Sequence, residues 1–203
     1  MKAFYPYQYP TTPKKRRHGP WGYKHHRYFQ DWLEDEFSFR CVYCLKRMTW
    51  APTDIWSADH VVPQSKAPGL ALEYGNLVLA CQKCNGRKQA TSVPDPCEWP
   101  YANSLRVEDP SGEISHLDEI GEDLVRILKL NCDEYVAERR KNLRTLKALA
   151  RIDPAYWKEM MGYPRNLPDL KRKNRKENTR REGISESFSE LKNRGELPEQ
   201  YEE

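Results

Sequence analysis

The sequence predicts an α+β fold in which short strands and amphipathic helices surround a metal-binding frame. Two short apolar segments, one ending at Asp59-His60 and one covering residues 76–80, are typical of strands. A helical period covers residues 28–39 and returns beyond residue 116. Two C-x-x-C pairs bracket the predicted strands, which places a metal centre at their base.

The composition is that of one compact unit with solvated extensions. The chain has 203 residues, of which 32% are charged, and its formal net charge is +4. It contains no uninterrupted apolar run of the roughly 18 residues that a membrane span needs, and its first residues lack the apolar stretch of a signal peptide. We therefore expect a cytoplasmic protein without a membrane partner.

Residues 1–28 are predicted to form an extended arm, because they combine prolines and aromatic residues without a helical period. A basic block without an intervening acid lies in this arm, and aromatic side chains follow it. Such a block indicates contact with nucleic-acid phosphates, and the alternative is a solvated or disordered segment. The residues predicted to contact nucleic acid are Lys14, Lys15, Arg16 and Arg17.

Residues 28–39 are predicted to form a helix that leads to the first cysteine pair. Four large apolar side chains recur at i, i+3, i+4 and i+8, which is the spacing of one helix face. These side chains are Phe29, Trp32, Leu33 and Phe37.

Four of the six cysteines are predicted to hold a structural zinc ion. In a cytosolic chain, two C-x-x-C pairs indicate a metal rather than disulfides. A site with four thiolates is saturated, so any catalytic ion must be a different one. The predicted zinc ligands are Cys41, Cys44, Cys81 and Cys84. Cys97 and Cys132 are left over, and we expect them to be small buried side chains.

The segment between the two cysteine pairs is too long for a simple zinc ribbon and must fold as an excursion from the metal. It begins as irregular structure and continues as a strand that ends at Asp59-His60. A loop over residues 63–69 and a second short strand follow. We expect residues 85–88 in the first turns of a helix.

The order of polar residues across this excursion resembles the HNH nuclease family. In that family two strands and a helix, the ββα-metal fold, surround one catalytic divalent ion. The residues that carry the resemblance are Asp59, His60, Asn76, Asn85 and Lys88. The segment DHVVPQS is particularly similar to the HNH domain of RNA-guided CRISPR effectors, and the cysteine frame resembles the zinc-pinned branch of the family. The resemblance covers roughly residues 37–90, within a nuclease domain that we place at residues 29–100.

The resemblance implies a role for each of these residues. His60 would be the general base, Asp59 and Asn85 would hold a catalytic Mg²⁺ or Mn²⁺, and Asn76 would tie the loop. Imidazole can accept a proton from water at neutral pH, because its unperturbed pKa is about 6.5. Mg²⁺ typically takes one or two protein carboxylates beside substrate phosphate oxygens. One position departs from the family signature, since Asn85 stands where a histidine is usual.

Two basic residues follow the second cysteine pair. Arg87 and Lys88 lie where they could hold the scissile phosphate or its neighbour. The alternative is that both are solvated helix residues.

Residues 101–162 are predicted to form a hairpin and three helices. Residues 109–112, Asp-Pro-Ser-Gly, suit a four-residue type I turn. Asn131 is predicted to cap the second helix with Glu134 as its capping-box partner, and Gly162 closes the third. The apolar stripe predicted for the second helix is Val136, Leu143, Leu146 and Ala150.

The opposite side of that second helix is strongly basic and could face DNA or an acidic partner. Its residues are Arg139, Arg140, Lys141, Arg144 and Lys147. The whole segment loosely resembles the tail of HNH subunits from prokaryotic anti-phage systems of the Septu type, which act with an ATPase partner. This resemblance implies that the nuclease is gated by a nucleotide-binding partner.

Residues 163–203 are predicted to be a charged, flexible tail. A basic block, LKRKNRKENTRR, covers residues 170–181, and the chain becomes acidic beyond it. Because polar composition dominates this segment, we expect no regular structure there.

These observations favour a zinc-stabilised, metal-dependent HNH endonuclease that cleaves DNA to 5′-phosphate and 3′-hydroxyl ends. DNA follows from the family resemblance, and RNA stays open because nothing in the sequence reads a 2′-hydroxyl. The alternatives are a non-catalytic, zinc-stabilised nucleic-acid-binding module and an RNA-cleaving nuclease gated by a partner.

Overall fold

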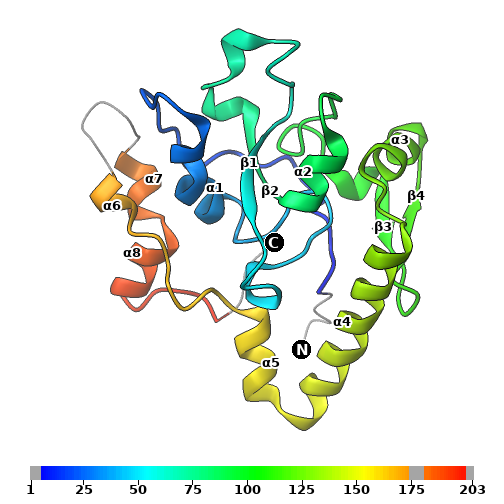
Figure 1. Cartoon of the computed structure of the whole chain (residues 1–203). Helices are drawn as coiled ribbons and strands as arrows, with labels where there is room; N and C mark the ends of the chain where they lie inside the picture. The colour runs from blue at the N-terminus through cyan, green and yellow to red at the C-terminus, as the bar shows by residue number, and fades with distance from the viewer. Residues whose placement is uncertain (1–5, 174–180, 200–203) are drawn as a thin grey trace.

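The computed structural model describes residues 6–173 and 181–199 (Figure 1). The strands are β1 (Trp56–His60), β2 (Leu77–Cys81), β3 (Leu105–Val107) and β4 (Ile114–His116). The α-helices are α1 (Gln30–Glu36), α2 (Gln82–Lys88), α3 (Glu119–Leu128), α4 (Asp133–Ile152), α5 (Pro154–Met161), α6 (Leu170–Lys173), α7 (Arg181–Ser185) and α8 (Phe188–Asn193). Among the short 3-10 helices are η1 (His26–Phe29), η2 (Met48–Trp50) and η4 (Tyr74–Asn76). The mixture of helices and strands confirms the α+β class.

A ββα unit made of β1, β2 and α2 lies at the centre of the molecule (Figure 1). β1 and β2 pair antiparallel, with Asp59 opposite Val78 and His60 opposite Leu77. Every residue of β2 is buried, and α1 packs against this strand. α2 begins directly after Cys81, and residues 85–88 lie within its two turns, as predicted.

One hydrophobic core holds the described parts of the chain together. Trp32 and Leu33 of α1 and Leu79 of β2 are fully buried in it. Burying one such side chain contributes about 1.5–3 kcal/mol to folding. The helix predicted before the first cysteine pair is therefore confirmed, as η1 and α1, together with its apolar face.

The predicted arm is extended over most of its described length, but it packs onto the core. Tyr7, Tyr9 and His18 are buried. The His18 ring lies 2.9 Å from Asp35 of α1, and the His18 amide donates to Glu36 over the same distance. The arm is thus part of the folded molecule.

The described part of the tail contains α6, α7 and α8, so the expectation of no regular structure is wrong there. Leu170 and Ile184 are buried in the common core, and the amide of Phe188 donates to Asp35 at 2.8 Å. Residues 174–180, which include much of the second basic block, lie outside the described residues. The division into four segments stays a prediction, although buried side chains from each segment meet in one cluster.

The hairpin and the three helices predicted after residue 101 are present, with two corrections. The amide of Gly112 donates to the carbonyl of Glu108, so the hairpin loop is longer than the predicted four-residue turn. Asn131 does not cap α4. Its side chain instead binds the amide and the carbonyl of Ile114 at 2.8 Å each, and Cys132 is the N-cap residue.

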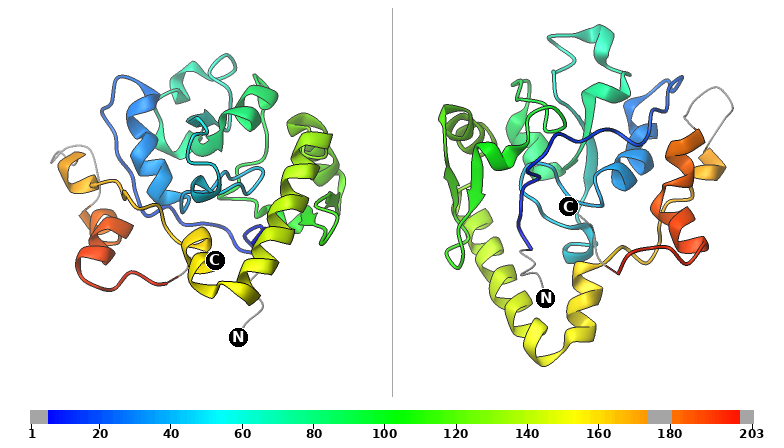
Figure 2. Two further views of the ribbon diagram at one scale, coloured as in Figure 1. Left: turned by 60° about the horizontal axis from the view of Figure 1, so that its bottom comes forward. Right: turned by 180° about the vertical axis from the view of Figure 1, so that it is seen from behind.

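α4 and α5 form a pair of helices that projects from one end of the molecule (Figure 2). α5 returns to the core, where Met160 accepts hydrogen bonds from Thr49 and Trp50 of η2. The tail helices lie on the far side of the ββα unit from α3 and α4 (Figures 1 and 2). No helix among the described residues is long and apolar enough to cross a membrane.

Candidate metal centre and adjacent pocket

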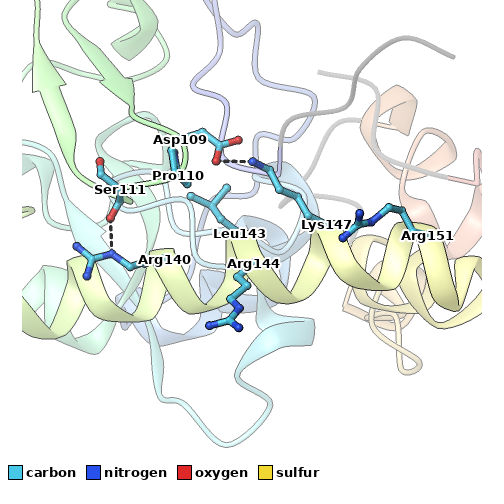
Figure 3. A pocket seen from close by; sticks show the side chains of 8 residues that line it. All are labelled: Asp109, Pro110, Ser111, Arg140, Leu143, Arg144, Lys147 and Arg151. Carbon is cyan, nitrogen blue, oxygen red and sulfur yellow. Dashed lines mark hydrogen bonds and ion pairs between the residues drawn. The ribbon is translucent and has the colours of Figure 1, made fainter.

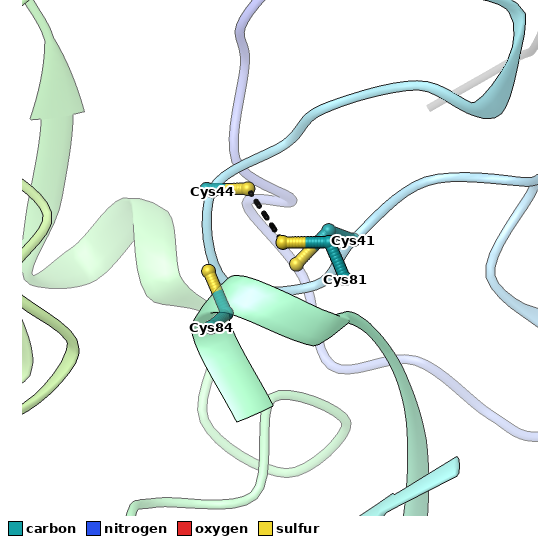
Figure 4. A group of neighbouring side chains, drawn as sticks. All are labelled: Cys41, Cys44, Cys81 and Cys84. Atoms are coloured by element: carbon teal, nitrogen blue, oxygen red, sulfur yellow. Dashed lines mark hydrogen bonds between the residues drawn. The ribbon is translucent and has the colours of Figure 1, made fainter. Parts of the chain in front are cut away.

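The four paired cysteines form a compact buried cluster (Figure 4). Cys41 and Cys44 lie in the loop after α1, Cys81 ends β2, and Cys84 lies in the first turn of α2. Their sulfur atoms all lie within 4.8 Å of one another, and the Sγ atoms of Cys44 and Cys81 are 3.8 Å apart. A tetrahedral zinc ion with bonds of about 2.3 Å separates its sulfur ligands by about 3.8 Å. The cluster therefore fits the predicted zinc site.

Backbone hydrogen bonds shape the loop that carries the first pair. The amide of Cys41 donates to Lys46 and the amide of Leu45 donates back to Cys41, which closes a tight knuckle. Leu45 has a φ of 62°, a left-handed conformation that the knuckle requires. The amide of Val42 donates to Leu79 of β2, so the knuckle is joined to the strand that ends in the second pair.

Tyr135, near the start of α4, contacts the sulfur cluster, and sequence reasoning did not find it. Its hydroxyl lies 3.2 Å from Cys84 Sγ and 3.7 Å from Cys81 Sγ. The guanidinium of Arg87 lies over the Tyr135 ring, 4.2 Å from its centroid. The contact joins residues far apart in the chain, and the only sequence signal is a tyrosine near the start of an amphipathic helix.

An open pocket of about 250 Å³ lies at the end of β1 that faces α2. Asp59, His60 and Asn85 line it, so three of the residues predicted for catalysis lie around one cavity. Asp59 is buried and His60 is half-buried, in agreement with side chains on opposite sides of a strand. The remaining lining comes from the loop after β1 and from the end of α2: Pro63, Gln64, Ser65, Gln89 and Ala90.

The His60 ring is oriented by a backbone carbonyl. Its Nε2 lies 3.0 Å from the carbonyl oxygen of Ala71, which can only accept a hydrogen bond. The side-chain nitrogen of the exposed Gln64 lies 3.1 Å from the same nitrogen. A proton on Nε2 satisfies the contact with the carbonyl and leaves the lone pair on Nδ1.

Asn76 holds the loop that contains Ala71. Its side-chain oxygen accepts from the amide of Val62 at 2.8 Å, and its nitrogen donates to the carbonyls of Val62 and Leu70. These are the loop-tying bonds that the sequence led us to expect of Asn76.

Asp59 is held in a buried network. Its carboxylate accepts from the Tyr43 hydroxyl at 2.6 Å and lies 3.4 Å from the Lys88 ammonium. Burial raises the pKa of Asp59, while Lys88 and Tyr43 oppose that shift. Burial likewise lowers the pKa of Lys88, and Asp59 opposes it. Desolvation thus disfavours both charges, which is usual for a buried ion pair.

The position of Lys88 differs from the one predicted. Its side chain is only 1% exposed, and its ammonium donates to the His60 carbonyl at 2.5 Å besides contacting Asp59. Lys88 therefore faces the inside of the ββα unit rather than a phosphate at the surface. Arg87 turns toward α3 and α4, where it donates to the carbonyl of Lys129.

Asn85 of α2 lines the pocket together with Asp59. Its side-chain nitrogen donates to the hydroxyl of Ser57 at 2.9 Å, and its oxygen has no hydrogen bond to the described residues. One carboxylate from Asp59 and one amide oxygen from Asn85 form an oxygen donor set that suits Mg²⁺ or Mn²⁺. The residues present thus fit the predicted catalytic ion.

A second histidine, His26 of η1, lies beside His60 and was missed as a site residue. The two ring centroids are 5.1 Å apart, and the ring of His25 lies against that of His26 at 4.4 Å. Burial and the two neighbouring imidazoles lower the pKa of His26. From the sequence, His25 and His26 can be recognised only as members of the basic arm. No local pattern predicts that His26 contacts His60 of β1.

Three of the four arm residues predicted to contact nucleic acid are engaged within the molecule. Arg16 donates to the carbonyls of Leu77 and Gly75, Arg17 pairs with Asp35, and Lys14 lies 3.9 Å from Glu36. Lys15 is exposed. Contact between this block and nucleic acid stays a prediction.

Comparison with known proteins shows which family this region resembles. Residues 41–91 match the family model described as HNH endonuclease. The ββα unit and the four-cysteine cluster lie within the same residues, so this region is similar to the HNH endonuclease family in sequence and in its arrangement of elements.

A curated relative is the Septu protein PtuB of Bacillus thuringiensis. It is 31% identical over 75 residues, which are 37% of this chain and 27% of that protein. The chain therefore aligns with little more than a quarter of the relative's length. No solved structure matches the chain.

Proposed function

We propose that this chain is a metal-dependent endonuclease that hydrolyses DNA phosphodiester bonds. The observation that carries the proposal is the pocket in which the imidazole of His60 meets the oxygen donors of Asp59 and Asn85. The family match over residues 41–91 supports the same chemistry.

Asp59 and Asn85 are the residues that would hold the catalytic Mg²⁺ or Mn²⁺. Such an ion, when bound, stabilises negative charge on the phosphate and on the departing 3′ oxygen. Lys88 and Tyr43 orient the Asp59 carboxylate, since both contact it inside the ββα unit.

His60 acts as the general base. With Nε2 bound to the Ala71 carbonyl, Nδ1 is free to accept the proton of the attacking water. Asn76 supports this geometry, because it binds the carbonyl of Leu70, the residue before Ala71. General-base assistance of this kind typically accelerates a reaction by about 10²- to 10⁴-fold.

The biological role that we propose is that of an effector in prokaryotic defence, acting in the cytoplasm and restrained by a partner. The similarity to a Septu protein supports this role. The loose resemblance of residues 101–162 to Septu-type HNH subunits implies that a nucleotide-binding ATPase provides this restraint. The isolated chain is then expected to cleave slowly, and the partner to be recovered with it from its native cell.

Cleavage of supercoiled plasmid by the purified chain tests the proposed activity. We expect nicked or linear product with Mg²⁺ or Mn²⁺ and none with EDTA, since the pocket residues need the ion. An RNA of similar length, assayed in parallel, distinguishes the two nucleic acids. Absence of metal-dependent cleavage of either substrate, with and without the native partner, would refute the proposal.

A further inference from the structure

A basic groove lies between α4 and the β3–β4 hairpin (Figure 3), and it shares no lining residue with the pocket of His60. This α4 groove has a volume of about 470 Å³ and is lined by the loop 109–111, by Leu143 and by four basic side chains of α4. These side chains are Arg140, Arg144, Lys147 and Arg151. From the proposed function and the observations below, we infer that the α4 groove binds the phosphate backbone of the nucleic-acid substrate.

The charge of the groove favours a polyanion. Four basic side chains face one acid, Asp109, which pairs with Lys147 at 2.6 Å. Arg144 and Arg151 are exposed and have no hydrogen bond or ion pair to any residue that the structure describes. Both guanidinium groups are therefore available, and guanidinium binds phosphate in a two-pronged geometry.

The cations form a row rather than a point. They follow one another along α4 (Figure 3), and the rise of an α-helix sets the distance from Arg140 to Arg151 at about 16 Å. One DNA strand carries a charge about every 3.4 Å along the helix axis, so a row of this length faces several phosphates. A single small anion would leave most of the row unused.

The hydrophobic content of the groove argues against a protein partner. Of its apolar lining residues, Leu143 is only 3% exposed, which leaves Pro110 as the accessible one. Interfaces between proteins have a central region that is depleted of charged residues and enriched in aromatic ones. The α4 groove has the opposite composition.

The walls of the groove are fixed by the fold. Arg139 was predicted on the basic side of α4 from its charge. It is instead buried, and it donates to the carbonyls of Gly112 and Leu130. Gly112 has a φ of 76°, and a Cβ there would lie 2.7 Å from the backbone nitrogen of Arg140. Arg140 donates to the carbonyl of Ser111 at 3.0 Å. The loop is therefore clamped onto α4 and the groove needs little rearrangement to bind a ligand.

Salt-dependent binding tests the groove directly. The binding of a 30-base-pair duplex DNA is measured by fluorescence anisotropy at several salt concentrations, in a His60→Ala background that slows cleavage. We expect Arg144→Ala/Arg151→Ala to reduce the slope of log K against log salt by about 2, since each lost phosphate contact removes about 0.9. The matched control is Arg126→Ala/Lys192→Ala, which removes two cations outside the groove and should leave most of the slope intact.

Two further ligands separate the sources of negative charge. A single-stranded RNA carries the same backbone chemistry. A reduced slope for the groove variant with either DNA or RNA therefore supports the proposal and identifies the nucleic acid. Poly-glutamate represents an acidic protein. If the groove variant binds DNA and RNA with the parent's slope, the proposal is wrong, and loss of poly-glutamate binding alone would assign the surface to an acidic partner.

Plasmid cleavage by the unmutated chain distinguishes failure of the groove proposal from failure of the nuclease proposal. Cleavage together with an unchanged slope would reject the groove only. A reduced slope without cleavage, in the presence and in the absence of the native partner, would keep the groove and reject the nuclease.

Discussion

At the scale of single residues, the sulfur cluster is supported by a side chain from another part of the fold. Tyr135 brings a hydroxyl to Cys84 and Cys81, and Arg87 covers its ring. A phenol donates its proton to an acceptor such as a thiolate. Partners of this kind around metal ligands typically change metal affinity by about 10- to 100-fold. Tyr135 therefore joins α4 to the cysteine cluster.

Tyr135→Phe should weaken zinc binding while leaving the fold intact, because it removes only the hydroxyl. We expect zinc to transfer to a chromogenic chelator at least about tenfold faster than in the parent chain. Tyr156→Phe removes an exposed hydroxyl from α5 and serves as the control. Equal transfer rates in the parent and Tyr135→Phe would show that the hydroxyl does not act on the metal site.

At the scale of elements, the close contact between the β3–β4 hairpin and α4 depends on Gly112. A Cβ there would lie 2.7 Å from the backbone nitrogen of Arg140 and 2.9 Å from the carbonyl of Val136. The sequence predicts the hairpin and the helix but not this contact. The buried bonds of Arg139 and Asn131 were missed for the same reason, since a charge pattern and a capping motif carry no information on distant backbone partners.

Gly112→Ala should destabilise the protein by more than the backbone cost of placing an alanine at a positive φ. Gly195 has a similar φ of 70°, and no atom of the described residues lies within 4 Å of the position that a Cβ would take there. Gly195→Ala therefore measures the backbone cost, about 1–2 kcal/mol. For Gly112→Ala we expect at least about 1 kcal/mol more, because overpacking typically costs about 1–3 kcal/mol. Urea unfolding compares the two, and equal losses would show that the hairpin moves away from α4 freely.

At the scale of the whole molecule, α1 joins the two ends of the described chain. The buried carboxylate of Asp35 contacts Arg17 and His18 of the arm and accepts from the amide of Phe188 in the tail. The sequence predicted an extended arm from prolines and aromatic residues without a helical period, and a flexible tail from its polar composition. Their few apolar anchors, Tyr7, Tyr9, Leu170 and Ile184, are too sparse to form a periodic pattern.

Asp35→Ala should loosen both ends at once. Removing one partner of a buried charged network typically costs about 3–5 kcal/mol, because the remaining groups stay buried without it. Asp31→Ala removes a partly exposed carboxylate of the same helix, one that pairs with Lys173, and should cost less than about 1 kcal/mol. The measurement is again the free energy of unfolding in urea. Similar values for the two variants would mean that Asp35 does not hold the arm and the tail.

More of the structure of the ββα unit could be predicted from the sequence than of any other part of the molecule. Its cysteines and polar residues follow a fixed order, and each lies within or directly beside a strand or helix that local pattern predicts. The inward turn of Lys88 and the approach of His26 to His60 could not be predicted, because both depend on how distant segments pack.

The central claim is that His60 is the base of a metal-dependent nuclease, and one comparison tests it most directly. Plasmid cleavage with Mg²⁺ or Mn²⁺ is measured for the parent chain, His60→Ala and His116→Ala, with zinc content and thermal unfolding recorded for each. His116 is exposed on β4, outside the pocket, and controls for loss of an imidazole. We predict that His60→Ala keeps its zinc and its fold but cleaves at least about a hundredfold more slowly, while His116→Ala cleaves like the parent. Cleavage by His60→Ala at the parent's rate would contradict the account.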